Sequence, residues 1–286
     1  MADRILIVTA VAAEADSVAR GLTGDKPGGA FLQALPGGYA LHRHTSTDPL
    51  PVGPGGPLSA HGPLSGAASA GALAPPGGRI PLPGPHHPVV DVLVAGVGPA
   101  AAAAATSAAL AWATLGHTPY DLVVSTGIAG GFAPHAPLGS VVVADTIVAA
   151  DLGAQTPDGY LPVEELGFGR SAHPVPQALA HRIAQALGDG VQRHCVGPVL
   201  TVSTVTGTAA RAAELAERHP GAAAEAMEGF GVAEAAAAYG VPVAEIRAVS
   251  NAVGPRDRAN WRIGQAMDAL RYAFQLLSST VFREPM

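Results

Sequence analysis

Short runs of β-branched and other apolar residues alternate along this chain with alanine-rich stretches of helical length, and this alternation limits its fold most strongly. The apolar runs, each long enough for a strand, are residues 4–10, 89–95, 121–126, 140–148, 199–203 and 243–250. The helical stretches are residues 100–115, 175–187, 208–218, 228–239 and 263–279. Because the strands are apolar throughout rather than at alternate positions, both faces of the sheet should be covered. The pattern predicts an α/β fold in three layers, with a mainly parallel central sheet covered by helices.

The stretch at about 45–88 breaks this rhythm. It is crowded with Gly, Pro, Ser and Ala, carries little charge and has no period that would form a core face. We expect it to be a flexible insertion between two strands of the same sheet, so that residues 1–286 form a single domain. His86 and His87 stand at its end without a nearby Cys, Asp or Glu, which favours solvated loop histidines over a metal site.

Composition narrows the classes of function. A net charge of -6 with 16 Lys and Arg provides no basic stripe, which argues against nucleic acid as a partner. The one cysteine, Cys195, forms neither an intramolecular disulfide nor a cysteine-paired zinc site, so we expect a cytoplasmic protein. Residues 92–115 carry no charge, but Gly96 and Pro99 interrupt them, which favours a strand, a turn and a helix over a membrane span. No signal peptide is expected at the N-terminus.

Two glycine-rich segments lie at predicted strand ends. The run 96–101 matches the G-x-G-x-x-A dinucleotide fingerprint, yet Asp121 stands at the start of the next strand rather than at its end, where the fingerprint needs an acid. A close strand-to-helix turn is therefore the better interpretation, and a dinucleotide-binding sensor is the non-enzymatic alternative. The run 125–131 is compatible both with a ligand-binding loop and with an ordinary turn.

Isolated polar residues also gather at predicted strand ends. Glu14 follows the first strand, Glu228 begins a helix, and Ser250 and Asn251 end the last strand. Each carboxylate by itself would suit a helix N-terminus. Together they form a set placed where a parallel sheet assembles an active site.

These segments resemble the motifs of a known enzyme family. The runs 8–14, 126–131, 226–228 and 247–251 are similar, in order and approximate spacing, to those of the methylthioadenosine/adenosylhomocysteine nucleosidases. The resemblance covers nearly the whole chain apart from the insertion. It implies a nucleoside-phosphorylase-like fold and a homodimer that cleaves a purine nucleoside without metal or cofactor. Within this superfamily, the runs 227–231 and 250–257 are most similar to futalosine hydrolases, which implies a step of menaquinone biosynthesis.

The resemblance also implies residue roles. Glu14 would hold the attacking water as a catalytic residue, Glu228 and Met227 would bind the ribose, and Asn251 would act at the base. The other implied base-binding positions are Ile128, Ala129, Gly130, Val205 and Thr206. Cleavage of the C–N bond develops positive charge on the ribose and negative charge on the purine, so carboxylates suit the sugar side and hydrogen-bond donors suit the base side.

Asn251 stands where the methylthioadenosine pattern has aspartate. Adenine presents an acceptor, N7, beside a 6-amino donor, and a protonated aspartic acid matches that pair. Hypoxanthine presents two acceptors, N7 and O6, which the NH₂ group of an asparagine matches with two donors. The residue therefore predicts a 6-oxopurine nucleoside such as futalosine.

The 5′ side of futalosine ends in a benzoate, and the residues after Asn251 are candidates for binding it. Arg256 and Arg258 would bind the carboxylate, Trp261 would cover the ring, and Val11 would add apolar surface. The alternative is a loop stabilised by ion pairs with Asp257 and anchored by a buried tryptophan.

Two enzymatic alternatives keep the same fold. One is a nucleosidase for an adenine-bearing substrate, such as methylthioadenosine, adenosylhomocysteine or aminofutalosine. The other is a phosphorylase, which would need several cations around the ribose, and the sequence has no basic cluster near Glu14 or Gly127.

Overall fold

The computed structural model describes residues 4–24, 31–45 and 88–283. The predicted insertion therefore lies outside the described residues except for its two ends, Thr45 and Pro88. No helix in the described ranges has the length and apolar character needed to cross a membrane. Residues 92–115 instead form the end of a strand, a turn and a helix, as predicted.

The predicted strands and helices are all present, and the chain adds further strands to them. The strands are β1 (Arg4–Thr9), β2 (Phe31–Ala34), β3 (Ala40–Thr45), β4 (Val89–Val94), β5 (Leu122–Gly131), β6 (Val141–Ala149), β7 (Gly153–Thr156), β8 (Gly159–Pro162), β9 (Ala172–Pro174), β10 (His194–Thr201), β11 (Ala224–Ala226) and β12 (Val243–Ala252). The α-helices are α1 (Ala12–Thr23), α2 (Pro99–Leu115), α3 (Gln177–Asp189), α4 (Ala209–Arg218), α5 (Gly229–Ala238) and α6 (Ile263–Ser279). Short 3₁₀ turns are η1 (Pro36–Gly38), η2 (Arg258–Asn260) and η3 (Val281–Arg283). The added strands are β2, β3, β7, β8, β9 and β11.

A mixed sheet in the order β11-β10-β6-β12-β5-β1-β4-β3-β2 forms the central layer, with β9 beside β6. Its longest ladders, β12 with β5 and β10 with β6, are parallel, whereas β12 and β6 run antiparallel. Strand β11 also pairs with β5, so the sheet closes on itself through β5, β12, β6, β10 and β11. Closure gathers the ends of these strands around one site.

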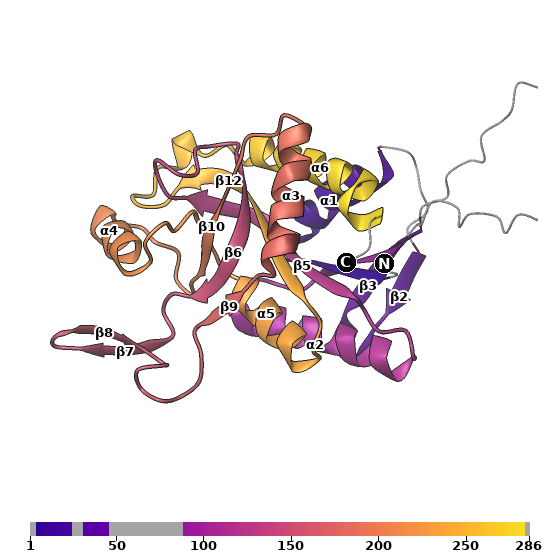
Figure 1. Ribbon diagram of the computed structural model, residues 1–286, viewed down its shortest axis with the longest axis horizontal. Helices are drawn as coiled ribbons and strands as arrows, with labels where there is room; N and C mark the ends of the chain where they lie inside the picture. The colour runs from indigo at the N-terminus through magenta and orange to yellow at the C-terminus, as the bar shows by residue number, and fades with distance from the viewer. Residues whose placement is uncertain (1–3, 25–30, 46–87, 284–286) are drawn as a thin grey trace, which may run out of the picture.

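Helices cover both faces of this sheet (Figure 1). Helices α1, α3 and α6 pack together on one face, and α2 and α5 pack against each other on the opposite face. The hairpin of β7 and β8 forms a separate two-stranded sheet that extends away from the layers (Figure 1). The predicted three-layer fold with a mainly parallel mixed sheet is confirmed.

Three glycines allow the close approach of β4, α2 and α5. Gly96 and Gly98 adopt φ of +91° and +95°, which fits the turn from β4 into α2 that the sequence predicts. Gly231 of α5 lies against Pro99, where an added Cβ would stand 2.0 Å from the Pro99 carbonyl oxygen. Any side chain at residue 231 would therefore push α2 and α5 apart.

Candidate active site

Glu14 is a buried carboxylate near the start of α1, 3% exposed. Its Oε2 accepts hydrogen bonds from the backbone N–H groups of Ala10 at 3.0 Å and Val11 at 3.3 Å. Its Oε1 accepts one from the N–H of Ile128 in β5 at 2.9 Å. The Glu14 carboxylate thus accepts hydrogen bonds from the backbone just before α1, as expected of an acid in the first turn of a helix. It also accepts one from the backbone near the end of β5. Burial raises the pKa of Glu14 despite these hydrogen bonds and the nearby Arg247 guanidinium.

Glu228 is a second buried carboxylate, 7% exposed, directly before α5. Its Oε1 accepts a hydrogen bond from the N–H of Gly98 at 3.2 Å. Its Oε2 lies 3.2 Å from an NH1 atom of Arg247. The glycine turn that resembles a dinucleotide fingerprint therefore donates to Glu228. Met227, the other predicted ribose-binding residue, is half-buried in the same turn between β11 and α5.

Arg247, to which no role was assigned from the sequence, connects the two carboxylates. This residue of β12 is 0% exposed, and its NH2 donates to Ser125 Oγ at 3.2 Å. A Cβ added to Gly127 would lie 2.5 Å from Glu14 Oε1 and 3.0 Å from Arg247 NH1. The absence of a side chain at Gly127 therefore leaves room for the Glu14 carboxylate and the Arg247 guanidinium to approach each other. The available signal was an arginine in a largely apolar run, two residues after Glu245, where a charged side chain needs partners.

Asn251 lies at the end of β12, beside Gly130 of β5. Its Oδ1 accepts a hydrogen bond from Ser250 Oγ at 2.8 Å, and its Nδ2 donates to the Ala252 carbonyl at 3.0 Å. The Ser250 hydroxyl therefore sets the orientation of the amide. One of the two N–H donors expected for the purine is already used, which leaves one to offer to a ligand without rearrangement.

The other predicted base-binding residues lie on two segments joined by a buried carboxylate. Ile128 and Gly130 are half-buried on β5, whereas Ala129 is buried and its carbonyl accepts from Ser250 Oγ at 3.3 Å. Thr206 is buried, its N–H donates to Glu225 Oε1 at 2.9 Å, and its hydroxyl also bonds Glu225. Glu225 pairs with Gly130 across β11 and β5, so it ties the Thr206 loop to the predicted base site. Val205, in the same loop, is exposed.

Glu225 was not foreseen as a supporting residue. Burial raises its pKa, and the hydrogen bonds from Thr206 limit that rise. An acidic residue within an alanine-rich segment was the only indication in the sequence.

Three of the four residues predicted for the 5′ side lie together. The guanidinium carbons of Arg256 and Arg258 lie 5.4 Å and 5.7 Å from the ring centroid of Trp261. Trp261 is half-buried rather than the fully buried anchor of the alternative interpretation, and Asp257 accepts a hydrogen bond from Asn260 at 2.7 Å. Val11, the fourth predicted residue, is exposed at the start of α1.

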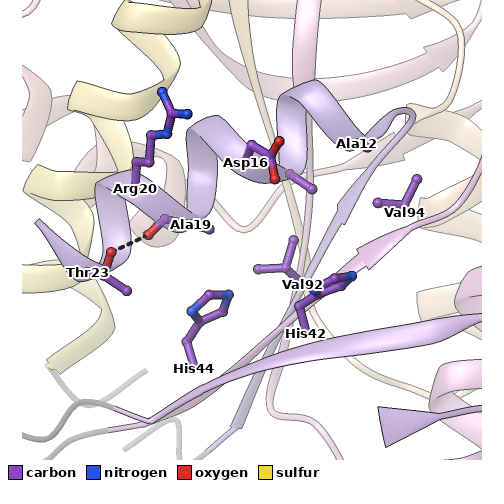
Figure 2. A pocket seen from close by; sticks show the side chains of 10 residues that line it. Ala12, Asp16, Ala19, Arg20, Thr23, His42, His44, Val92 and Val94 are labelled. Carbon is purple, nitrogen blue, oxygen red and sulfur yellow. Dashed lines mark hydrogen bonds between the residues drawn. The ribbon is translucent and has the colours of Figure 1, made fainter. Parts of the chain in front are cut away.

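A separate pocket of about 370 Å³ lies between α1 and the strands β3 and β4 (Figure 2). His42 and His44 of β3 line one side of this pocket, and Asp16 and Arg20 of α1 line the other, with the Arg20 guanidinium pointing away from the histidines (Figure 2). Glu14 is not among its lining residues, so this pocket is distinct from the carboxylate cluster. Within the described ranges, no group of three or more His, Cys, Asp and Glu residues could hold a metal ion.

Comparison with known proteins agrees with this architecture. The sequence pattern of the phosphorylase superfamily matches residues 85–281. The chain therefore belongs to the phosphorylase superfamily.

The chain is 66% identical over 180 residues to a futalosine hydrolase of Streptomyces coelicolor, covering 63% of this chain and 74% of the relative. It is 42% identical over 279 residues to one of Acidothermus cellulolyticus, covering 98% and 92% respectively. The chain therefore belongs to the futalosine hydrolase family, as the motif resemblance predicted. A native structure of futalosine hydrolase from Helicobacter pylori superposes with a TM-score of 0.69 at 15% identity, covering 98% of this chain and 99% of that one, which bears on the fold alone.

Proposed function

We propose that this chain hydrolyses the N-glycosidic bond of futalosine and releases hypoxanthine and dehypoxanthine futalosine. The observation that carries the proposal is the pair of buried carboxylates, Glu14 and Glu228, held around one buried guanidinium at the ends of parallel strands. Such a site favours a sugar that becomes positively charged as its bond to the base breaks.

On the sugar side, Glu14 is the general base. It takes a proton from water while the water oxygen bonds to C1′ and the electron pair of the C1′–N9 bond leaves with the purine. Its raised pKa makes it a stronger base than an exposed glutamate, because burial disfavours the charged form. Glu228, with Met227 beside it, binds the ribose hydroxyls.

On the base side, Asn251 donates an N–H to the 6-oxopurine, which stabilises negative charge as the base leaves. Ser250 supports this role by fixing the amide orientation. Ile128, Ala129, Gly130, Val205 and Thr206 surround the base, and Ala129 contributes through its backbone.

At the 5′ side, Arg256, Arg258 and Trp261 receive the benzoate, with Val11 nearby. Both guanidinium groups lie over the Trp261 ring, so the three side chains are close enough to act on one ligand. An arginine can bind the carboxylate of the benzoate, and the indole can cover its ring. We further propose a cytoplasmic homodimer acting in menaquinone biosynthesis, as the family resemblance implies.

A panel of substrates tests this proposal. Purified protein is incubated with futalosine, aminofutalosine, methylthioadenosine and inosine, and the released base is identified by chromatography. Futalosine should give hypoxanthine at the highest kcat/KM. Preferred release of adenine from aminofutalosine or methylthioadenosine would instead assign the chain to the adenine-specific nucleosidases.

A further inference from the structure

Glu245 is a fully buried carboxylate to which the mechanism above gives no task. It stands in β12 two residues before Arg247, and so on the same face of that strand, and it is 0% exposed. Its Oε1 accepts a hydrogen bond from Arg247 Nε at 2.8 Å. Its Oε2 has no hydrogen-bond partner within the described part of the chain. Burying a carboxylate with one unsatisfied oxygen is costly, so its presence needs a reason.

The surroundings of Glu245 are built to accommodate it. A Cβ added to Gly229, the first residue of α5, would lie 2.2 Å from Glu245 Oε2. Only glycine there leaves room for the carboxylate. Gly229 directly follows Glu228, so Glu245 lies against the backbone that presents a proposed ribose-binding carboxylate.

Arg247 is held on two sides by groups of the sheet. Glu245 accepts from its Nε and Ser125 accepts from its NH2. These contacts leave NH1 3.2 Å from Glu228 Oε2, without a hydrogen bond in the described part of the chain, and beside the space at Gly127 that Glu14 also approaches. The direction of NH1 therefore depends on the anchor that Glu245 provides.

This cluster contains three carboxylates but a single guanidinium group. The charged groups acting on Glu245, among the described residues, are Arg247 of its own strand and Glu228 ahead of α5, and Glu14 of α1 acts on the same guanidinium. Burial raises the pKa of Glu245, and Arg247 opposes that rise. If the guanidinium faced Glu14 and Glu228 alone, its charge would make Glu14 a weaker base and oppose positive charge on the sugar.

We propose that Glu245 is a positioning residue for the glycosidic reaction. By pairing with Arg247 Nε, it anchors the guanidinium between Glu14 and Glu228 and offsets its positive charge. The inference rests on the proposed hydrolysis, because a reaction that builds positive charge on the sugar gains from this offset.

The test compares pH profiles of kcat/KM and kcat for wild type, Glu245→Gln and Glu245→Asp, using whichever nucleoside of the four-member panel the wild type cleaves. Glu245→Gln keeps the size of the side chain and removes its charge. We expect kcat at the plateau to fall by about tenfold or more and the acid limb of kcat/KM to move to lower pH, because the positive charge of Arg247, no longer offset by Glu245, acts more strongly on Glu14. Glu245→Asp keeps the charge but shortens the side chain, so kcat should fall while the acid limb stays near that of the wild type.

The matched control is Glu234→Gln, which removes a carboxylate 3.0 Å from Arg170 outside the cluster and should change neither kcat nor the limb. Circular dichroism and thermal melting establish that each variant is folded. If Glu245→Gln does not fold, Glu245→Met, which also removes the charge at a similar side-chain length, takes its place in the same comparison.

Unchanged kcat in Glu245→Gln would overturn the inference. A lower kcat with the acid limb in its original place would also overturn it, because that result indicates a purely structural role for Glu245. A limb displaced in Glu245→Asp would also overturn it. If the wild type cleaves a nucleoside and the variants give one of these contradicting results, the inference fails but the proposed function stands. Absence of base release by the wild type from all four nucleosides would instead refute the function, and the inference with it.

Discussion

The two oxygens of the Glu14 carboxylate contact different parts of the chain. Oε2 accepts from the backbone just before α1, and Oε1 accepts from Ile128 at the end of β5. A glutamine would keep one acceptor oxygen at this position, would place its NH₂ group against one of these backbone donors, and would not take a proton from water.

Glu14→Gln should therefore lower kcat by about 10²- to 10⁴-fold, the usual contribution of general base catalysis, while the protein stays folded. Glu228→Gln should also lose turnover, since the sugar would face one negative charge fewer. Steady-state kinetics on futalosine checks both, with Glu214→Gln on the exposed face of α4 as the matched control. Near-normal turnover in either site variant would remove that residue from its assigned role.

Asn251 is the residue on which selectivity for the base depends. Asn251→Asp replaces an N–H donor by a carboxylate that repels O6 and the negative charge developing on the purine. Loss of one buried hydrogen bond costs about 1–3 kcal/mol, or roughly ten- to a hundredfold in relative kcat/KM. The variant should cleave futalosine more slowly near neutral pH and shift its relative preference toward aminofutalosine.

Competition between the two nucleosides in one reaction measures this preference directly. Equal cleavage by the wild type, or full retention of the futalosine preference in Asn251→Asp, would show that donor matching at residue 251 does not set the choice of base.

At the scale of elements, Asp91 joins the neighbouring strands β1, β4 and β3. It is fully buried in β4 and accepts hydrogen bonds from Arg4 of β1, Arg43 of β3 and the Tyr120 hydroxyl, at 2.7 to 3.0 Å. Burial by itself would raise the pKa of Asp91, but these hydrogen bonds outweigh it and hold the pKa below its usual value.

Asp91→Asn should lower the free energy of unfolding by about 2–3 kcal/mol, somewhat less than for a fully buried pair because both arginines are partly exposed to solvent. A carboxylate with a depressed folded pKa stabilises the fold above its unfolded pKa, and this contribution is lost as the pH falls through the folded pKa. The difference from wild type should therefore be large at pH 7 and shrink in acid. Urea titrations at several pH values measure it, with Asp158→Asn in the exposed β7–β8 hairpin as the control, and a pH-independent difference would contradict the account.

Elements with strong patterns were predictable from the sequence. Residues 263–279 form α6 with the predicted bounds, because its apolar positions repeat at helical spacing against the sheet. Strand β5 continues through Gly131, five residues beyond its predicted end, since β11 and β12 supply its hydrogen-bonding partners there. The exposed hairpins β2–β3 and β7–β8 were not foreseen, because little of their surface is buried and their pattern is correspondingly weak.

The site was predictable in part for similar reasons. Glu14, Glu228 and Asn251 stand at strand ends, where the sequence alone indicates function. Arg247 and Glu245 lie inside β12, and their meeting with the two carboxylates depends on how β12, β5 and α5 pack. Periodicity along one strand carries no information about such contacts.

At the scale of the whole molecule, the insertion is attached at the end of β3 and the start of β4, whereas Glu14 follows the end of the strand β1, which runs parallel to β4. Thr45 and Val89 are register partners in the antiparallel ladder of β3 and β4, so the segment 46–88 connects two adjacent strand ends. A two-residue Asn-Gly turn is the natural connection for such a hairpin.

Replacement of residues 46–88 by Asn-Gly should therefore give a folded enzyme with wild-type kcat and an unchanged or higher melting temperature, because a shorter loop costs less entropy to close. Thermal melting and futalosine turnover check this, and size-exclusion chromatography shows whether the oligomeric state is preserved. Aggregation or loss of turnover would mean that the segment takes part in assembly or catalysis.

Phosphate dependence tests the central claim most directly. Futalosine is incubated with the purified protein in phosphate-free buffer and in buffer containing phosphate, and hypoxanthine and the sugar product are quantified together. Hydrolysis predicts equal rates in the two buffers and one dehypoxanthine futalosine for each hypoxanthine. Hypoxanthine release only with phosphate, accompanied by a sugar 1-phosphate, or no hypoxanthine release in either buffer, would contradict the account.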